Sequence, residues 1–520
     1  MFESICNLVY LFPKIRFNTK NKTYLRLVRP DIDFEKYNGM NVIIAWISSL
    51  ITYILTETVE IAFIVLIFAF YFIWNLPKME LDKRKSRIET ELPFFLRNFG
   101  MLIEIGIPFT RAMELSSSGY RSTKKELQIV LNKVNTGLSM QKALSELGIL
   151  FNSTIIKRAV SQLILLYETG GSGKEIKKVG DDILSFQQHR LKEYSAKSSI
   201  FGLVFVMTSA ILPTFFIVYA ITGSIGFGTK INQMQMAIAL LVIFPAISAL
   251  LLLLSKTTMP SSIFTNSKWF EWELLLPGIL IITGTFLFDY KIIFFAAGLV
   301  VGVYLTIKNF NYERRIEQIE SEMPDALFVI SSMPGSSGVD LIFETIKKGD
   351  LGNISNEFGI AKKQLDMNIK TDIVIEDLVK RNRSELFRQM LVMMKQMIET
   401  NSLAYISSLA EDIIKHIEIK RERSQLLATQ KYTLIMGTVI VPIILRTVIN
   451  LIETMESVVG PETVREVITS CGFLVPPYLI VYVSMVSIAI ADSEGKKSSA
   501  SLYLVVLSIL SLASFYFINL

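Results

Sequence analysis

Residues 87–115, "RIETELPFFLRNFGMLIEIGIPFTRAMEL", decide the fold because a second stretch of the same chain aligns with them. The second stretch is residues 318–346, "QIESEMPDALFVISSMPGSSGVDLIFETI". Residue 318 aligns with residue 87, so the two stretches are offset by 231 residues. Gly106 and Gly338 align after a slip of one residue. Five positions are identical without a gap: Ile88 and Ile319, Glu89 and Glu320, Glu91 and Glu322, Pro93 and Pro324, and Leu96 and Leu327. Self-similarity at a fixed period indicates modular construction.

A later pair of stretches shares this offset. Residues 166–190, "LYETGGSGKEIKKVGDDILSFQQHR", align with residues 397–421, "MIETNSLAYISSLAEDIIKHIEIKR". The identical positions include Glu168-Thr169 with Glu399-Thr400, Asp181 with Asp412, and Arg190 with Arg421. Each stretch leads into an apolar segment that contains "ILP" or "IVP". The repeated unit therefore consists of a hydrophilic block and the start of the apolar segment behind it.

The run Gly170-Gly171-Ser172-Gly173-Lys174 looks like part of a phosphate-binding loop. Such a loop reads G-x-x-x-x-G-K-[ST], because backbone N–H groups hold the phosphates and the hydroxyl holds Mg²⁺. Glu168 stands at the first glycine position and Glu175 at the hydroxyl position, so two carboxylates would face anionic phosphates. The second copy has residues 401–404, "NSLA", in place of the glycines. We therefore interpret the glycine run as a turn between two helices.

The composition is typical of a membrane protein. Of 520 residues, 51% are apolar, and the mean hydropathy is +0.45, well above the usual value for soluble domains. Only two cysteines, Cys6 and Cys471, and two histidines, His189 and His416, are present. No disulfide framework or four-cysteine metal site can be built, and the histidines lack the local partners of a catalytic triad. We expect no metal, no cofactor and no enzymatic activity.

Residues 40–76 pose the main question of topology. They are apolar except for "TETVE" at residues 56–60, which indicates either one overlong helix or a hairpin of two short ones. A hairpin places the basic N-terminal arm on the same side as both charged blocks, as the positive-inside rule requires. Seven further segments are long enough to span a bilayer: residues 200–223, 234–254, 272–288, 292–307, 432–452, 472–491 and 501–518. We predict a multi-pass protein of the cell membrane with nine spans, a cytoplasmic N-terminus and a C-terminus outside.

This topology divides the chain into six parts. They are a cytoplasmic N-terminal arm (1–39), a transmembrane hairpin (40–76), a first cytoplasmic domain (77–199), four transmembrane helices (200–307), a second cytoplasmic domain (308–431) and three transmembrane helices (432–520). Prolines inside the spans predict kinks, because neighbouring groups can satisfy the backbone that proline frees. These prolines are Pro213, Pro245, Pro277, Pro442, Pro476 and Pro477.

Both hydrophilic blocks show helical spacing of apolar residues. In the second block, Leu386, Met390, Met393, Met394 and Met397 follow the i, i+4, i+7, i+8 and i+11 pattern of one helix face. We interpret this stripe as core packing, and a methionine-rich binding surface is the alternative. No alternating β-pattern persists, so the predicted fold class is all-α: a polytopic membrane protein with about nine transmembrane helices and two repeated cytoplasmic helical bundles.

Charge distinguishes the two blocks. Residues 77–199 contain 20 Lys and Arg against 13 Asp and Glu, a net charge of +7, whereas residues 308–431 contain 18 against 19, a net charge of −1. The basic residues directly behind the hairpin are explained by the positive-inside bias or by anionic headgroups of the lipid bilayer. Those deeper in the first block predict a docking face for an acidic partner: Lys124, Lys125, Lys133, Lys142, Lys157 and Arg158. No motif for nucleic-acid binding accompanies this charge.

The assembled pattern is a Glu-x-Glu-[Leu/Met]-Pro start, a Gly-[Ile/Val] break, a Glu-Thr helix junction and a proline-bearing apolar segment. It resembles the type II secretion F domain of membrane platform proteins in type II secretion, type IV pilus and archaellum machines. Two copies of the resemblance cover most of residues 77–452. Two such domains separated by four spans, after an N-terminal hairpin, look most like the archaeal platform of an archaellum or a type IV pilus.

The resemblance implies a non-enzymatic scaffold. Its cytoplasmic domains would meet a hexameric secretion ATPase, its spans would handle pilin-like or archaellin-like subunits, and it would act as a homodimer. Glu168 and Glu399 stand at the family's acidic helix junction, where they would cap a helix, form an internal salt bridge or contact the partner. Gly106 and Gly338 stand at the glycine break, where an architectural role is expected.

Movement of the ATPase would reach the membrane through the helices that run from each block into a span. Arg446 is the one basic residue well inside a span. It is predicted to meet a polar group of a subunit, to snorkel toward the outside, or to pair within the bundle. A transporter with regulatory helical domains is the alternative function, although its spans would need buried ion-binding groups. A membrane enzyme would need a catalytic constellation at membrane depth, which the sequence lacks.

Overall fold

The computed structural model describes residues 24–517, apart from residues 26, 28–31, 57–58, 227–232, 259–290, 336, 383, 401–405, 455–460 and 496–497. These described residues form helices and short connections, with no strand among them, which confirms the all-α prediction. The chain forms two compact units. Unit 1 comprises residues 1–184 and 261–263, and unit 2 comprises residues 185–260 and 264–520.

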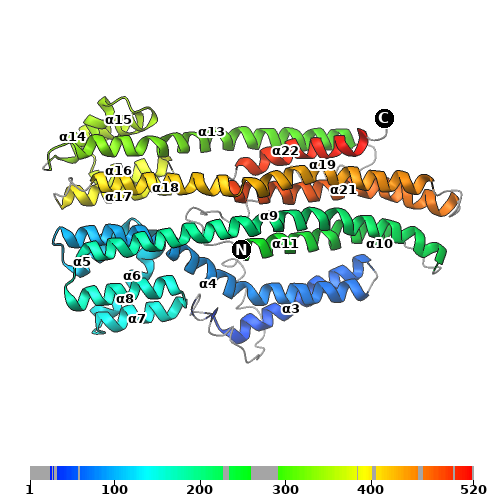
Figure 1. Cartoon of the computed structure of the whole chain (residues 1–520), viewed down its shortest axis with the longest axis horizontal. Coiled ribbons are helices and arrows are strands. Elements are labelled where there is room, and N and C mark those ends of the chain that lie inside the picture. Colours follow the sequence, from blue (N-terminus) through cyan, green and yellow to red (C-terminus); the bar gives the residue numbers. More distant parts are fainter. Residues whose placement is uncertain are drawn as a thin grey trace. The chain divides into compact units, whose positions relative to one another are not determined.

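Unit 1 begins with a helical hairpin. Helices α3 (Phe34–Thr56) and α4 (Val59–Glu104) pack against each other in opposite directions (Figure 1). The Ser49 hydroxyl donates to the Ala62 carbonyl at 2.8 Å, and the Tyr37 hydroxyl donates to the Ile73 carbonyl at 2.6 Å. The turn therefore falls within "TETVE", as the hairpin interpretation requires. That both helices cross a membrane stays a prediction.

Pro77 explains the position of the Tyr37 hydroxyl. A proline has no N–H, so the carbonyl four residues earlier in the helix, that of Ile73, loses its helical partner. The buried Tyr37 side chain supplies the missing hydrogen bond from the facing helix. The proline is thereby accommodated inside α4 without an unsatisfied backbone group.

Four short helices follow in unit 1: α5 (Phe109–Ser118), α6 (Arg121–Asn135), α7 (Met140–Phe151) and α8 (Thr154–Thr169). With the end of α4 and the start of α9 (Gly173–Gly226) they form what we call the first bundle. Its core includes Phe95, Phe99, Leu127 and Leu163, all buried. Serine hydroxyls cap α7 and α8, and left-handed residues end both helices, as expected for short helices joined by tight turns.

Unit 2 contains a second set of charged helices, which we call the second bundle. It consists of the end of α13 (Lys291–Ser331) with α14 (Val339–Lys348), α15 (Asn353–Asp366), α16 (Thr371–Asn382), α17 (Glu385–Glu399) and α18 (Ile406–Leu426). The predicted apolar stripe from Leu386 to Met397 lies on α17, and all five of its members are buried. The core-packing interpretation of the methionines is therefore confirmed.

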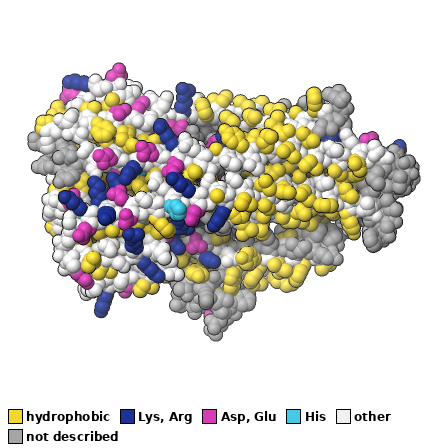
Figure 2. Space-filling model, viewed as in Figure 1, with side chains coloured by type: hydrophobic (Ala, Val, Ile, Leu, Met, Phe, Trp, Pro, Cys, Tyr) yellow, Lys and Arg dark blue, Asp and Glu magenta, His cyan; other side chains and the backbone are white. Residues whose placement is uncertain are grey.

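The remaining helices of unit 2 are apolar. They are the second part of α9, α10 (Gln233–Ile238), the π-helical turn η2 (Ala239–Ile243), α11 (Phe244–Thr258), α19 (Ala428–Thr454), α21 (Pro461–Glu494) and α22 (Ser498–Phe517). Their core contains Phe205, Leu445, Tyr478 and Val483. Figure 2 shows hydrophobic side chains over these helices on the visible face, whereas charged side chains gather on the bundles.

Five helices among the described residues are long and apolar enough to cross a membrane. They lie at Gly173–Ala220, Gln233–Ser255, Ala428–Thr454, Val467–Glu494 and Ser499–Phe517. Each overlaps one of the nine predicted spans. The predicted span at residues 272–288 lies outside the described residues, and that at residues 292–307 lies within α13. This last span and the two of the hairpin are not among the five and stay predictions.

The predicted prolines lie where apolar helices need local adjustment. Pro213, Pro442, Pro476 and Pro477 stand inside helices, and Pro245 is the second residue of α11, just after the π-helical turn. Pro277 lies outside the described residues. Pro213 frees the carbonyl of Ser209, which accepts a hydrogen bond from the Tyr478 hydroxyl at 2.6 Å.

Candidate functional site

The Glu-x-Glu-[Leu/Met]-Pro motif fastens each bundle to its long first helix. The first glutamate of the motif binds a serine that caps a later helix. In the first bundle the Ser153 hydroxyl donates to Glu89 Oε1 at 2.5 Å, and in the second the Ser384 hydroxyl donates to Glu320 Oε1 at 2.8 Å. Each serine also accepts the N–H of the residue three positions on. Both contacts therefore join corresponding residues of the 231-residue offset.

The second glutamate of the motif caps another helix. Glu91 accepts the backbone N–H groups of Ser122 and Thr123 at 2.8–3.2 Å, at the start of α6. Glu322 accepts the N–H of Ile354 at 2.8 Å, at the start of α15. A carboxylate at a helix N-terminus satisfies donors that the helix leaves free and interacts favourably with the helix dipole. Each motif thus ties the N-termini of two helices to one long helix.

The glycines of the first copy have a different use. Gly173 opens α9 and lies against Gly100 of α4, where a Cβ on Gly100 would stand 2.5 Å from the Gly173 carbonyl oxygen. Gly180 lies about two turns further along α9. A Cβ at this position would stand 2.8 Å from the carbonyl oxygen of Pro93. Gly170, at φ +66°, ends α8 in the left-handed region that glycine tolerates. The run that looks like a phosphate loop is therefore a helix turn and a close helix crossing.

This close crossing carries an ion pair that has no counterpart at the corresponding positions. The buried guanidinium of Arg97 on α4 binds Asp181 on α9. In the second copy, residue 328 is a phenylalanine, and Ser331 and Glu411 replace Gly100 and Gly180. The second bundle therefore cannot pack its first and last helices through the same glycine contacts.

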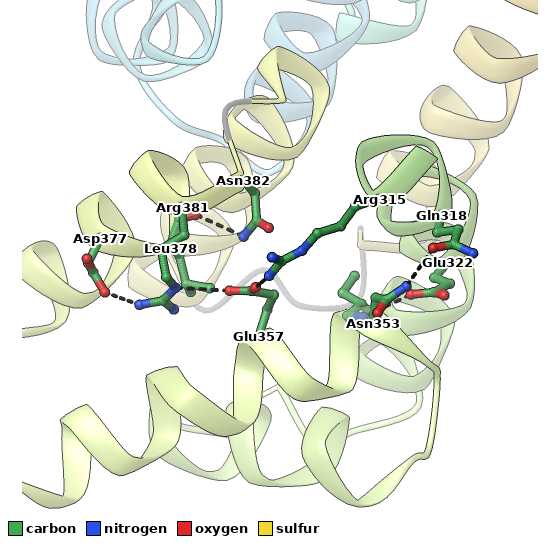
Figure 3. A network of polar contacts seen from close by, with 10 residues as sticks. Arg315, Gln318, Glu322, Asn353, Glu357, Asp377, Leu378, Arg381 and Asn382 are labelled. Carbon is green, nitrogen blue, oxygen red and sulfur yellow. Dashed lines mark hydrogen bonds and ion pairs between the residues drawn. The ribbon is translucent and has the colours of Figure 1, made fainter. Parts of the chain in front are cut away.

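The second bundle contains a charged network instead (Figure 3). Glu357 on α15 has a side chain that is only 2% exposed, and both Arg315 and Arg381 bind its two oxygens. Arg381 also pairs with Asp377, to which Gln364 donates at 2.8 Å. Because Arg315 comes from α13 and Arg381 from α16, the network connects three helices.

The corresponding position of the first bundle is Glu126. Arg84 corresponds to Arg315, but residue 150 is a leucine where the second bundle has Arg381. Burial raises the pKa of the Glu126 carboxyl, and the charges of Arg84 and Lys125 oppose this shift only in part. One glutamate is thus held by two arginines, and the other is left partly uncompensated.

The predicted docking lysines of α6 and α7 gather on one face. Lys133 of α6 pairs with Glu146 of α7 at 2.6 Å, and Lys142 lies one turn before Glu146. Lys125 is exposed two turns before Lys133, and Lys124 is half-buried. Exposed ion pairs are weak, so Lys133 can exchange Glu146 for another carboxylate at low cost.

Lys157 and Arg158 lie on α8, and Lys157 packs beside α7, where a Cβ on Gly148 would stand 3.8 Å from Lys157 Cγ. Lys157 donates to the Asn152 side chain at 2.8 Å, and Arg158 pairs with Asp182 of α9 at 2.8 Å. Both side chains are exposed. The predicted docking residues therefore lie on three helices, with Lys157 beside the end of α7 and Arg158 beside α9.

The two Glu-Thr junctions end corresponding helices. Glu168 lies in the last turn of α8, and Glu399 is the final residue of α17; both are exposed. The Thr169 and Thr400 hydroxyls each donate at 2.8 Å to the carbonyl four residues earlier. Glu399 also lies 3.4 Å from Lys395. An internal salt bridge is thus present at one junction, and partner contact stays a prediction for both.

The two glycines of the predicted break do different things. Gly106 follows α4 in the left-handed region at φ +88°, whereas Gly338 is extended at φ −74° and precedes α14. The connection from α13 to α14 is longer than that from α4 to α5, because α13 ends at Ser331, before the counterpart of Glu104. Both glycines are architectural, but only Gly106 needs the conformational freedom of glycine.

Arg446 is half-buried in α19. Its guanidinium lies 5.5 Å from the centre of the Phe515 ring on α22, within the range of a cation–π interaction. Pairing within the bundle is therefore present, and a contact with a filament subunit stays a prediction.

The sequence reasoning missed Ser153 and Ser384. They share the 231-residue offset and each precedes a helix, so extending the alignment would have found them. It also missed the Arg315–Glu357–Arg381 network, for which no local pattern exists. Among the described residues, no three His, Cys, Asp or Glu side chains gather as metal ligands would.

These features define a class. The described residues form an all-helical chain with five candidate membrane-spanning helices, in which motif glutamates clamp charged bundles to long helices that are apolar elsewhere along their length. Residues 95–220 match the family model of the type II secretion system (T2SS) protein F, so the chain carries a domain of the type II secretion F family. The match covers the end of α4, helices α5–α8 and most of α9. Comparison with curated proteins and with solved structures gave no match.

Proposed function

We propose that this protein is the non-enzymatic membrane platform of an archaeal archaellum or type IV pilus machine. The observation that carries the proposal is the F-family domain at residues 95–220. The Glu–Ser and Glu–helix contacts that recur 231 residues later support a second F-like domain at residues 308–431. A platform with two such domains would hold two cytoplasmic bundles under one set of spans.

The proposed topology has nine spans. The five apolar helices support it, together with the hairpin of α3 and α4 and the apolar N-terminal part of α13. The N-terminus and both bundles would lie in the cytoplasm, and the C-terminus outside. This arrangement keeps the charged helices of both bundles in water, as their composition requires.

The proposed partners are a hexameric secretion ATPase and pilin-like or archaellin-like subunits. The exposed Lys125 and Lys142, and Lys133 within its weak ion pair, support docking of an acidic ATPase surface on the α6–α7 face. Charge complementarity of this kind accelerates association and weakens with salt. The platform would act as a homodimer, with Arg446 near the path of the subunits and no role for nucleic acid.

The test is a mild-detergent pull-down of the tagged protein from its own cells, followed by mass spectrometry. A secretion ATPase together with short subunits that have apolar N-termini is the expected result. Their reproducible absence, combined with thermal stabilisation by a small solute, would instead favour a transporter.

A pair of variants locates the docking face. Lys125→Glu with Lys142→Glu should remove the ATPase from the pull-down. The matched control is Lys363→Glu with Lys370→Glu, which makes the same charge change at exposed positions of the second bundle. Equal loss in both variants would contradict docking on the α6–α7 face.

A further inference from the structure

Two helices that run from the bundles into the apolar part of unit 2 lie side by side and point the same way (Figure 1). Along α9 and α18–α19, contacts join Lys192 with Glu422 at 3.2 Å and Ser195 with Leu426 at 2.6 Å. Because the residue numbers rise together on both helices, the helices are parallel. The Ser195–Leu426 contact joins residues 231 apart, so the pair is in register with the internal alignment.

One of the two helices has a one-residue interruption at this level, at Leu427. Two backbone hydrogen bonds still run through it, from the Leu427 N–H to the Arg423 carbonyl at 3.0 Å and from the Lys431 N–H to the Leu427 carbonyl at 3.1 Å. α18 ends at Leu426 and α19 begins at Ala428, whereas α9 continues without a break from Gly173 to Gly226. The Ser195 hydroxyl donates to the carbonyl of Leu426, at the end of α18. The continuous helix thus spans the interruption in its neighbour and supplies a hydrogen bond there.

On the apolar side of the break the helices are tightly joined. The fully buried Ser198 hydroxyl binds the Gln430 side chain, which is also buried. Gly202 leaves room for Gln430, since a Cβ at position 202 would lie 3.3 Å from Gln430 Cγ. Gly437 lies against Val206, where a Cβ would stand 2.5 Å from Val206 Cγ2. Buried polar contacts and close backbone approach resist sliding of one helix past the other.

On the bundle side the contacts are weaker. Glu422 meets Lys192 at 3.2 Å and Gln188 at 3.4 Å. The Lys192 side chain is 59% exposed, so this ion pair is solvated and contributes little. The rigid part of the helix pair therefore begins at Ser195.

The end of α21 is held at the same level. Arg423 donates to the Asp492 carbonyl at 2.7 Å, and Lys431 pairs with Glu494 at 2.6 Å. These two cations stand on opposite sides of the break at Leu427. The interruption between α18 and α19 is thus fixed against α21 as well as against α9.

We propose that α9 and α19 act as one shaft from Ser195 onward, with Ser195, Ser198 and Gln430 as the residues that couple them. A displacement of either bundle would then enter the apolar helices through both members of the pair at once. The source of the displacement rests on the proposed function, but the coupling is a property of this chain alone.

Disulfide formation tests the coupling in the purified full-length protein. In a background with Cys6→Ser and Cys471→Ala, the pair Gly202→Cys with Gln430→Cys should oxidise readily. The Cβ position of residue 202 lies 3.9 Å from the Gln430 Cα atom, close enough for a disulfide. The control pair is Leu203→Cys with Met436→Cys on exposed faces of the same helices, which should stay reduced. Equal yields for the two pairs would overturn the proposed register.

Filament assembly in cells tests whether the helices move together. Cells with the oxidised Gly202→Cys, Gln430→Cys protein should assemble at least as many filaments as those with the reduced protein, in which the Ser198–Gln430 contact is lost. A shaft has no internal motion for the disulfide to block. Loss of filaments on oxidation alone would overturn the proposal.

A rescue experiment separates coupling from simple stability. Ser195→Ala with Ser198→Ala should reduce filament number while the protein level is unchanged. Adding the cysteine pair to this variant should restore filaments under oxidising conditions only. Failure to restore them, with the disulfide formed, would show that these serines do not act by coupling. If cells lacking the protein still make every filament, the proposed function fails, whereas the disulfide yields still report on the shaft.

Discussion

Glu126 in the first bundle and Glu357 in the second align at the 231-residue offset, but their surroundings differ. Glu357 is almost fully buried and is bound by Arg315 and Arg381. Glu126 has Arg84 and Lys125 nearby, and burial still raises the pKa of its carboxyl. The cost of removing the carboxylate from water is offset by two arginines in the second bundle. In the first bundle, Arg84 and Lys125 offset this cost only in part.

The difference shows that two bundles with the same motif glutamates can be held together by different contacts. In the first bundle, Gly100 and Gly173 bring α4 and α9 into close contact, with the Arg97–Asp181 ion pair beside them. In the second bundle, side-chain charges join α13, α15 and α16 instead. The motif glutamates are common to both, so they define the frame, and the remaining contacts are free to differ.

The largest expected effect comes from Glu357→Gln. It leaves two arginines facing a neutral amide, and we expect local opening of α15 to become easier by about 2–4 kcal/mol, as for a broken buried ion pair with one partly solvated partner. Hydrogen exchange of α15 peptides in the full-length protein measures this. Glu126→Gln is the matched control and should not destabilise α6. Equal destabilisation at both sites would break the comparison.

Gly100→Ala should have the next largest effect. The new methyl group meets the Gly173 carbonyl, and we expect a cost of about 1–3 kcal/mol from overpacking. Faster hydrogen exchange at the start of α9 is the measurement. Ser331→Ala, at the corresponding position of the second bundle, serves as the control. An unchanged exchange rate in Gly100→Ala would show that the glycine crossing is not tight.

Ser153→Ala and Ser384→Ala should have smaller and similar effects. Each removes a helix cap and a partner of a motif glutamate, with an expected cost of about 1 kcal/mol. Hydrogen exchange in the first turns of α8 and α17 reports the two losses separately. An effect in one bundle alone would indicate that the motif clamps only that bundle.

The smallest expected effect is the pH dependence at Glu126. Its pKa is raised in the folded protein, so the folded state binds the proton more tightly than the unfolded state does. Stability of α6 should therefore rise as the pH falls from neutral through the raised pKa toward 4.5, the ordinary pKa of a glutamate. Glu126→Gln should abolish this slope. A slope of the opposite sign in hydrogen exchange, corrected for intrinsic rates, would contradict the shift.

The helices and the matched positions of the two bundles could be predicted from the sequence because their signals are local. Apolar residues repeat along each helix, and the motif residues recur at one offset, as the stripe from Leu386 to Met397 illustrates. Contacts between distant helices could not be predicted in the same way. Ser153 lies 64 residues from Glu89, and only the packing of α8 against α4 brings them together.

The candidate docking residues show the same limit. Net charge indicated a basic first block, but it could not show that Lys133 faces Glu146 or that Arg158 faces Asp182. Those pairings depend on how α6, α7, α8 and α9 are arranged in space. Only the structure shows which lysines are exposed and therefore available to bind a partner.

Tyr478 and Pro213 constrain the order in which this sequence can change. The buried tyrosine hydroxyl donates to the carbonyl that the proline deprives of its partner. A phenylalanine at position 478 is therefore tolerated only after residue 213 has regained an N–H. The same order holds for Tyr37 and Pro77. Substitutions at these pairs should be found together in related chains, although each pair is far apart in sequence.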